Sequence, residues 1–425
     1  MALPTPTMPD GAIDESQRDG VPTPGSDTAD PTPEPSSPAP EPSEEANDYP
    51  FPGKIAIITN HPDYGTEEYW SAQYLVNKYG SEKIVHKTWP SNFVQEGDPY
   101  YVTIPYWIIH EDPDIRAIII NRADIGTNFT VDRIMGYRDN LLFVYCNPAE
   151  NPADVATRAH LILNTNDALR GETIITTAKA MGAEVFVHYS FPRHLGMRTI
   201  AARREVMMAN CERMGILFVD IHAPDPTGPG GAQETQQFIL EDVPRQIAEY
   251  GTNTAFFGTN CSMQAPLQRM VAVHGAIYPE PCCPSPYHFF PGTFNVIDRF
   301  FDGSVMGVDA DRNPVDKGRL RPVSDFVGEI RRNIAARGAT GRLATWPVPV
   351  SMLSTVIGTE YAIKWINGEV PRERGIIDYA AIEEICEAYI YETTGEHLGV
   401  ELNPFSMSGR SYHNYVLILP DSIVF

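Results

Sequence analysis

The chain lacks the segments that would carry it across a membrane. No run of about 18 apolar residues occurs in its 425 residues, so no stretch predicts a transmembrane helix. The first residues also lack the basic segment followed by an apolar one that marks a signal peptide. We therefore expect that the chain begins after a removed signal segment and that it contacts a membrane only through a lipid tether.

Positive charge is scarce and nowhere concentrated. The chain has 32 Lys and Arg residues against 55 Asp and Glu residues, with a formal net charge of −23 and no dense basic run. Binding of nucleic acid needs a basic face that releases counterions from the phosphates, and anionic lipid attracts a polybasic patch. Both partners are therefore disfavoured.

Cysteines are few and the common enzymatic motifs are missing. The six cysteines form no C-x-x-C pair, and the neighbours Cys282 and Cys283 suit neither a zinc knuckle nor an ordinary mutual disulfide. A disulfide elsewhere stays open. The chain has no G-x-G-x-x-G, no G-x-x-x-x-G-K-[ST] and no G-x-S-x-G, so three frequent catalytic uses of an α/β fold lose their signature.

Aromatic residues are absent from residues 1–47, which carry ten acidic residues against the single basic Arg18. Prolines there alternate with Thr, Ser, Glu and Asp, so residues 1–49 cannot bury enough apolar surface to offset their ordering entropy. Two interpretations stay open. The segment is either a plain disordered tail or a tether that holds a domain away from a cell surface.

From Lys54 onward, short apolar runs alternate with amphipathic helical stretches, and the series starts twice. Strands are predicted at 54–59, 83–88, 117–121, 141–146, 161–164, 184–190, 217–222, 254–258, 276–278 and 415–419. Helices are predicted at 67–79, 99–110, 131–138, 169–181, 198–214, 233–250, 263–273, 325–337, 353–367 and 378–393. Apolar strands joined by helices indicate parallel sheets covered on both faces. The predicted fold class is α/β, with two Rossmann-like doubly wound lobes joined by a hinge.

The same pattern suggests the domain boundaries. We assign residues 1–49 to the Pro- and acid-rich tether. Residues 50–165 with roughly 346–395 form the N-terminal lobe, and 166–345 form the C-terminal lobe. The latter includes an irregular insertion at 282–321, where Pro, Gly and aromatic residues replace the helical period. Residues 396–425 are a C-terminal extension.

Several stretches resemble an uncharacterised family of predicted bacterial lipoproteins with the type I periplasmic-binding-protein fold. They are KIAIITN at the first strand and residues 82–96, 167–182, 183–194, 223–245 and 252–260. The similarity covers residues 53–275 well and the helices after Arg342 more loosely, and it is lost at 282–321 and after Glu396. The resemblance implies the two-lobed fold and a binding role similar to that of sugar- and nucleoside-type solute-binding proteins, but no particular ligand.

Candidate binding residues follow the predicted strands, because doubly wound sheets bind ligands beyond the carboxyl ends of their strands. They are rich in amides, hydroxyls and arginines, which suit a small polar solute. The predicted ligand-binding set is Asn60, His61, Tyr64, Asn121, Arg122, Asn147, Ser190, Arg193, His194, Asp225, Thr259, Asn260 and Trp346. Asn60 and Asn260 are alternatively helix N-caps. Tyr64, Phe191 and Trp346 are candidate stacking platforms.

The run Ser190-Phe191-Pro192-Arg193-His194 is the most specific cluster. Arg193 is predicted to pair with a ligand carboxylate or phosphate, the alternative being a salt bridge between the lobes. A catalytic triad of Ser190, His194 and Asp225 is the alternative, but it has no positive support. A nucleophile normally sits in a strained elbow directly before a helix, whereas here Pro192 follows Ser190 two residues later.

A metal site from His61, Asp63, Glu67 and Glu68 is disfavoured, because the two glutamates suit the first turn of a helix. His188, inside a strand, is predicted to be a core residue. We expect no catalytic residue, no cofactor and no metal.

The preferred hypothesis is a solute-binding lipoprotein outside the cytoplasm, anchored by lipid at the bacterial cell surface. It would close two lobes on a small polar solute for a membrane permease, as in ABC transport, or for a sensor. The alternative is an enzyme, a hydrolase or isomerase acting on a sugar- or nucleoside-like substrate in the cleft. A repressor is disfavoured because the acidic tail takes the place of a helix-turn-helix. A surface protein with a degenerate cleft is the remaining alternative.

Overall fold

The computed structural model describes residues 50–62, 66–89, 99–296, 301–302, 306–308, 314–316, 319–320 and 323–425. The predicted tether at 1–49 and two candidate residues, Asp63 and Tyr64, lie outside these ranges. No helix in the described ranges is both long enough and apolar enough to cross a membrane.

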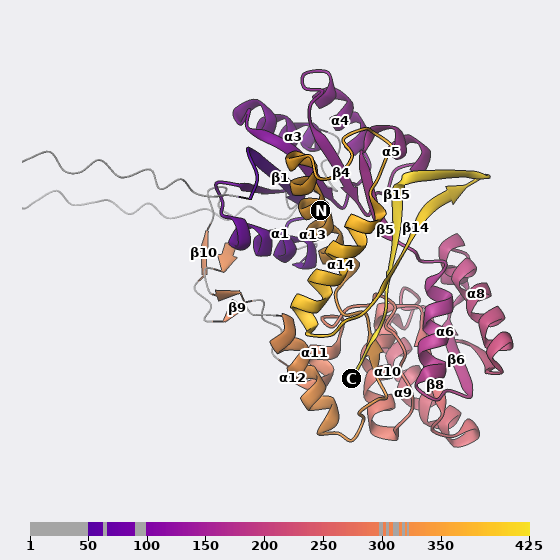
Figure 1. Cartoon of the computed structure of the whole chain (residues 1–425). Coiled ribbons are helices and arrows are strands. Elements are labelled where there is room, and N and C mark those ends of the chain that lie inside the picture. The colour runs from indigo at the N-terminus through magenta and orange to yellow at the C-terminus, as the bar shows by residue number, and fades with distance from the viewer. Residues whose placement is uncertain are drawn as a thin grey trace, which may run out of the picture. The chain divides into compact units, whose positions relative to one another are not determined.

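A seven-stranded sheet forms the centre of the first lobe (Figure 1). Its order is β14-β15-β5-β4-β3-β1-β2, and every neighbouring pair is parallel except β14 and β15. The strands are β1 (Lys54–Thr59), β2 (Ile84–Thr88), β3 (Ile115–Asn121), β4 (Leu142–Cys146), β5 (Leu161–Thr165), β14 (Val400–Met407) and β15 (Arg410–Pro420).

Helices cover both faces of this sheet, because its central strands are apolar and buried at successive positions, as in residues 55–58, 117–120 and 142–146. On one face, Ile57, Ile119 and Val144 pack against α1, α13 and α14. On the other, Ile58, Ile120 and their neighbours pack against α3, α4 and α5. These helices are α1 (Thr66–Tyr79), α3 (Pro99–Glu111), α4 (Thr127–Met135), α5 (Pro152–Arg158), α13 (Val350–Asn367) and α14 (Tyr379–Thr394).

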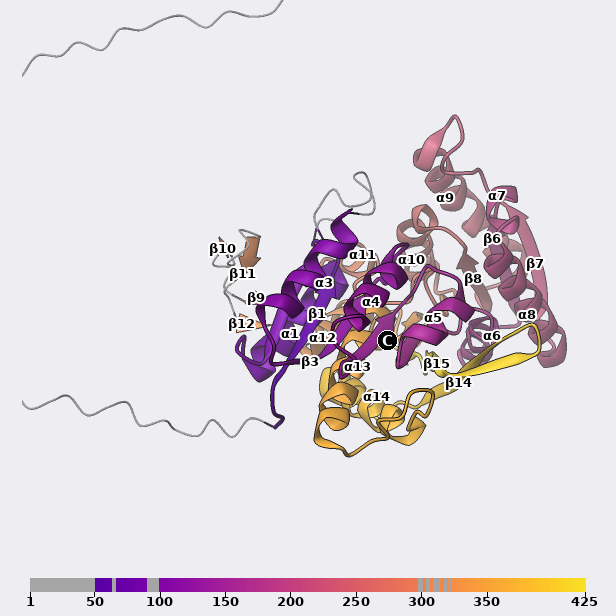
Figure 2. The same cartoon turned by 90° about the horizontal axis from the view of Figure 1, so that it is seen from above.

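The second lobe is built on the parallel three-stranded sheet β7-β6-β8. Its strands are β6 (Val185–Ser190), β7 (Leu217–His222) and β8 (Thr254–Gly258). The helices around it are α6 (Arg170–Ala180), α7 (Pro192–Leu195), α8 (Arg198–Met214), α9 (Gly231–Tyr250), η1 (Cys261–Met263), α10 (Gln264–His274), α11 (Phe290–Phe294) and α12 (Val323–Ala335). Figure 2 shows α6 and α8 beside β6 and β7, where they bury Phe186 and Phe257, and α9 to α12 cover the opposite face.

Short strands complete the structure. In the second lobe, β13 (Ala344–Thr345) pairs with β16 (Ile423–Val424). The predicted strand at 276–278 makes only two isolated bridges, from Ile277 to Ala255 and from Tyr278 to Leu343. Within 282–321 the structure describes two small antiparallel pairs. These are β9 (Phe301–Asp302) with β12 (Arg319–Leu320), and β10 (Met306–Val308) with β11 (Pro314–Asp316).

The chain passes between the lobes at three described places. It leaves the first lobe between β5 and α6, returns between β13 and α13, and crosses again between β15 and β16. The predicted α/β class with two doubly wound lobes is confirmed. The hairpin β14–β15 extends the first-lobe sheet, whereas the sequence predicted only one strand, at 415–419.

Candidate ligand-binding site

A pocket of about 590 Å³ takes its walls from residues of both lobes. This volume lies within the usual range for small-molecule sites. The first-lobe residues are Glu67, Glu68, Arg122, Asp124, Asn147, Pro148, Ala149, Asn164, Thr165, Pro349, Val350 and Ser351. The others are Asp167, Arg170, Met197, Thr199, Ile200, Arg203, Cys282, Cys283, Pro284, Ser285 and Trp346. We call this the interlobe pocket.

The first-lobe wall follows the carboxyl ends of β3, β4 and β5, as expected for a doubly wound sheet. Arg122 and Asn147 stand directly after β3 and β4, with φ of 57° and 49°. Left-handed backbone is unfavourable for a residue with a Cβ, and more so for arginine than for asparagine. Such strain clusters at functional sites, so these two positions support a binding role for this edge.

Glu67, in the first turn of α1, connects both sides of the pocket. Its Oε1 accepts a hydrogen bond of 2.8 Å from Ser285 and its Oε2 one of 3.0 Å from Ser351. Burial raises the pKa of Glu67 to about 7, although the two serine hydrogen bonds favour the ionised carboxylate. The carboxylate is therefore held in place by one serine from each side.

Two buried arginines form much of the second-lobe wall. Arg170 opens α6, and its Nε donates to the carboxylate of Glu280 while its Nη2 donates to the carbonyl of Pro281 at 2.6 Å. Arg203 from α8 is 3.4 Å from Asp167, whose carboxylate it shares with Arg170. Burial lowers the pKa of Arg203 to about 10, and the charge of Arg170 acts in the same direction. Both guanidinium groups remain cationic at neutral pH.

Three of the predicted binding residues line this pocket: Arg122, Asn147 and Trp346. Trp346 is only 1% exposed, and the guanidinium of Arg170 lies over its ring, 5.5 Å from the centroid. The predicted stacking platform is therefore already occupied by a cation from the protein. Phe191 is likewise fully buried, with Arg193 over its ring.

Side chains at or shortly after the ends of β6 and β8 bond to one another instead of lining the pocket. The Ser190 Oγ lies 3.0 Å from the Thr259 Oγ1, and the Nδ1 of His194 lies 3.2 Å from the same atom. Asn260 accepts from the backbone nitrogen of Ser262 at 2.9 Å and so caps η1, which is the alternative that the sequence left open. The Thr259 hydroxyl is thus hydrogen-bonded to both Ser190 and His194.

Arg193 and Asp225 form a pair on the second lobe. The Nε and Nη2 of Arg193 donate to the two carboxylate oxygens of Asp225, each at 2.8 Å, with the arginine side chain 48% exposed. Neither residue lines the interlobe pocket. Hydrogen bonds from Arg193 lower the pKa of Asp225. Both ends of this pair belong to one lobe, so it is not the interlobe salt bridge that the sequence suggested.

The remaining first-lobe candidates lie outside the lining. The side-chain nitrogen of Asn121 donates to the Ser351 carbonyl at 2.7 Å and to the Thr355 hydroxyl, so Asn121 joins β3 to α13. Asn60 is buried and His61 is half-buried. Neither is part of the pocket wall.

Sequence reasoning missed most of the second-lobe wall. Arg170, Arg203 and Ser285 do not follow strands directly; they reach the pocket from helices α6 and α8 and from the loop after 276–278. For Arg170, as for Glu67, the available signal was a charged side chain in the first turn of a predicted helix; Arg203 and Ser285 had no such signal. His188 is a core residue, as predicted: its ring is buried, with Nδ1 2.8 Å from Asp220.

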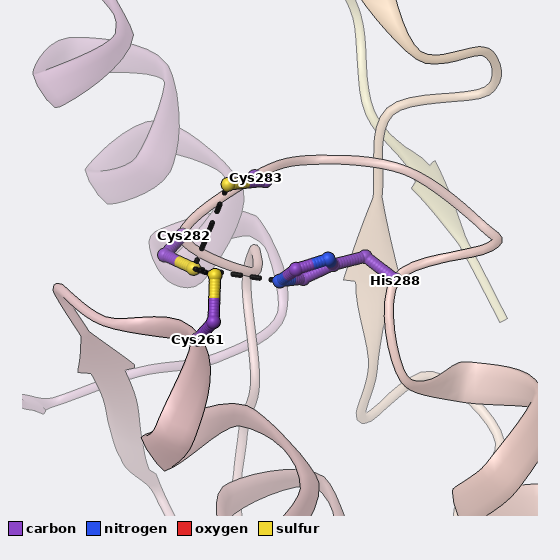
Figure 3. Close-up of side chains that lie close together, drawn as sticks. All are labelled: Cys261, Cys282, Cys283 and His288. Atoms are coloured by element: carbon purple, nitrogen blue, oxygen red, sulfur yellow. Dashed lines mark hydrogen bonds between the residues drawn. The ribbon is translucent and has the colours of Figure 1, made fainter. Parts of the chain in front are cut away.

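A second cluster shares two residues with the interlobe pocket, and Figure 3 shows its four side chains. The thiols of Cys261, Cys282 and Cys283 and the imidazole of His288 converge, and the four donor atoms all lie within 4.8 Å of one another. Cys282 and Cys283 also belong to the pocket wall. The sequence analysis did not anticipate this cluster, because Cys261 reaches it from η1, 21 residues before Cys282.

The two lobes and the pocket between them have the arrangement of the type I periplasmic-binding-protein fold. A protein from Clostridium difficile 630, named as a candidate transcriptional regulator, superposes with a TM-score of 0.74 at 19% identity. The likeness covers 88% of this chain and 99% of that one, and at this identity it establishes the fold alone.

The chain belongs to the family described as "Protein of unknown function (DUF3798)", whose profile matches residues 53–300. Two relatives from Treponema pallidum (strain Nichols) are each named only as an uncharacterised protein. One is 30% identical over 180 residues, which is 41% of this chain and 80% of the relative. The other is 29% identical over 167 residues, or 39% and 77%. The predicted resemblance to an uncharacterised family with this fold is confirmed.

Proposed function

We propose that the protein is a solute-binding protein that closes its two lobes on a small polar solute in the interlobe pocket, without transforming it. The observation that carries this proposal is the pocket itself. It is about 590 Å³ in volume, takes residues from both lobes and follows the carboxyl ends of three parallel strands.

The lining chemistry supports a solute with several hydrogen-bonding groups. Carboxylates and guanidinium groups are both present, so the pocket offers acceptors and donors fixed by partners on the protein. Arg122 is the more open cation, because its side chain is 52% exposed and its Nη1 is 3.9 Å from Glu68. Charged side chains that are already held by protein partners lose little conformational entropy when a ligand binds. They can therefore bind a polar ligand in a defined orientation at a small entropic cost.

The three passages of the chain between the lobes support a hinge. Domain closure concentrates its dihedral changes in a few residues at the ends of elements, which is where these passages lie. A solute that contacts both lobes binds the closed state more tightly than the open state. The difference between these two binding free energies is what shifts the equilibrium toward the closed state.

We further propose that the protein works outside the cytoplasm on a lipid tether and delivers its solute to a membrane permease or reports it to a sensor. The Pro- and acid-rich segment 1–49 is the feature that supports a tether.

Native mass spectrometry of the freshly purified full chain tests the binding role. We expect a co-purified small molecule, or binding by titration calorimetry when nucleosides, monosaccharides and amino acids are added singly. The bound compound should be recovered unchanged after prolonged incubation. Conversion of that compound would favour the hydrolase or isomerase alternative, and no binding by any compound would favour a degenerate cleft.

A further inference from the structure

The side chains of Cys261, Cys282, Cys283 and His288 have the spacing of a metal site. The Cys282 Sγ is 3.6 Å from the Cys261 Sγ, 3.8 Å from the Cys283 Sγ and 3.4 Å from the His288 Nε2. In Figure 3 the four side chains point toward one another, Cys261 from η1 and the other three from the loop that precedes α11.

The three separations from the Cys282 Sγ match those of a tetrahedral zinc site, and the other pairs of donor atoms lie within 4.8 Å. With Zn–S bonds of about 2.3 Å and a Zn–N bond of about 2.05 Å, tetrahedral angles place two sulfurs about 3.8 Å apart and a sulfur and nitrogen about 3.6 Å apart. A disulfide would need about 2.05 Å between its two sulfurs, and it would use only two of the three thiols.

We propose that Cys261, Cys282, Cys283 and His288 bind one zinc-class ion through three thiolates and the His288 Nε2. This inference goes beyond the proposed function and does not rest on it. A Cys₃His set of four protein ligands is typical of a structural zinc site, and thiolate donors select soft or borderline ions over Mg²⁺ or Ca²⁺.

The surroundings hold the two ligand-bearing segments in register. Gln264, fully buried just after η1, donates from its Nε2 to the carbonyl of Asn260 at 2.7 Å, and its Oε1 accepts from the Cys282 backbone nitrogen at 3.4 Å. Gln268, one turn further along α10, donates to the His288 carbonyl at 3.1 Å. Such outer contacts orient metal ligands before the ion binds.

Charge in the neighbourhood also suits a thiolate site. Three thiolates, a neutral imidazole and a divalent cation sum to −1. The buried guanidinium groups of Arg170 and Arg203 interact electrostatically with Cys283 and Cys282, respectively. They would offset the remaining charge of the occupied site.

Metal binding would fix the pocket wall from Cys282 to Ser285. This segment continues from the ligands Cys282 and Cys283 to Ser285, whose hydroxyl holds Glu67 at 2.8 Å. The ion would therefore serve the shape of the pocket rather than contact a solute as a catalyst.

Metal uptake by the reduced full chain tests the site. After removal of reductant without oxygen, zinc is added and unbound metal is removed. Elemental analysis should give one zinc per chain, and cobalt(II) in its place should show thiolate charge-transfer bands and the absorption of tetrahedral cobalt. Cys283→Ser, at an exposed position, and His288→Ala should each weaken zinc binding about a hundredfold or more. The control Cys211→Ala removes a buried thiol of α8, outside the cluster, and should retain one equivalent.

Circular dichroism of each variant shows whether the fold is retained. The proposal is overturned if the reduced chain, with its thiols free by titration, takes up neither ion. It is also overturned if uptake survives in both cluster variants, since the metal would then bind elsewhere. Solute binding is measured separately on the same samples, so a chain that binds zinc but no solute would contradict only the proposed function.

Discussion

Arg122 and Arg193 differ in how many of their hydrogen-bond donors are already used by protein carboxylates. Arg122 stands in a left-handed conformation with its side chain 52% exposed, and it faces the pocket. Arg193, chosen from the sequence as the main ligand-binding cation, is held by both oxygens of Asp225. A guanidinium in a bidentate pair has few donors left for a ligand.

We therefore expect Arg122→Ala to weaken solute binding by a factor on the order of ten to a hundred, because a hydrogen bond to a charged group is worth about 1.5–3 kcal/mol. Arg193→Ala serves as the matched control and should leave the dissociation constant unchanged. Titration calorimetry with the co-purified solute measures both. A loss in Arg193→Ala alone would move the site to the ends of β6 and β7, which hold part of the set predicted from the sequence.

The ion pair of Arg170 and Glu280 affects the stability of the fold, because both of its charges are buried. The two side chains are 3% and 0% exposed. Removing one partner of a buried ion pair leaves the other uncompensated in a poorly polarisable surrounding. Surface pairs lack this penalty, since water solvates the remaining charge.

Glu280→Gln is expected to lower the free energy of unfolding by about 3 kcal/mol or more. Glu172→Gln is the control, because it breaks an exposed pair in which Glu172 accepts from Arg213 at 3.0 Å, and it should cost less than about 0.5 kcal/mol. Urea denaturation of both variants checks this. Equal losses would mean that Arg170 is adequately served by Asp167 and the Pro281 carbonyl.

At the scale of elements, the close approach of α6 to α8 determines the second-lobe wall. A Cβ at Gly171 would lie 2.6 Å from the Arg203 carbonyl oxygen and 3.0 Å from the Val206 Cβ. The glycine thus lets the backbones come together, and Arg203 lies at the point of contact. Since Arg203 also lines the pocket, helix packing and pocket shape are linked here.

Gly171→Ala should destabilise the protein by about 1–3 kcal/mol, because backbone must move, even though alanine favours the helix by about 1 kcal/mol. Gly328→Ala in α12 is the control. Among the described residues its new Cβ would meet only the end of the flexible Arg332 side chain, at 3.5 Å, so stability should rise by up to about 1 kcal/mol. Thermal denaturation separates the two, and a stabilised Gly171→Ala would contradict the close approach.

At the scale of the whole molecule, the passages between the lobes matter most. Crossings at β5–α6, β13–α13 and β15–β16 connect the hydrophobic clusters of the two lobes, and Tyr287 and Leu398 pack against a cluster of each lobe. The clusters within one lobe can stay packed while dihedral angles change at the crossings, which is the condition for hinge motion.

Saturation with the co-purified solute should therefore reduce the radius of gyration in small-angle X-ray scattering without changing the circular dichroism spectrum. At the same solute concentration, a smaller fraction of the Arg122→Ala variant should bind solute. Its radius of gyration should therefore decrease less than that of the wild type. An unchanged radius in the saturated wild type would argue for binding without closure.

The sequence by itself determined the class of fold, because strands such as 54–59 and 254–258 are apolar at successive positions and alternate with amphipathic helices. Most predicted elements appear within a few residues of their expected bounds. The hairpin β14–β15 and the weak strand at 276–278 were harder, since edge pairing depends on which neighbour the chain meets in space.

The site was decided only by the tertiary structure. Strand ends identified Arg122 and Asn147, which lie next to their strands in sequence, but Arg170, Arg203 and Ser285 enter the pocket from helices and a loop. Likewise, Cys261 is 21 residues from its neighbour in space, Cys282. The spacing of apolar residues within a segment predicts which face of a helix or strand is buried. Which distant side chains come into contact depends on how the elements pack, and the sequence of one segment does not specify that packing.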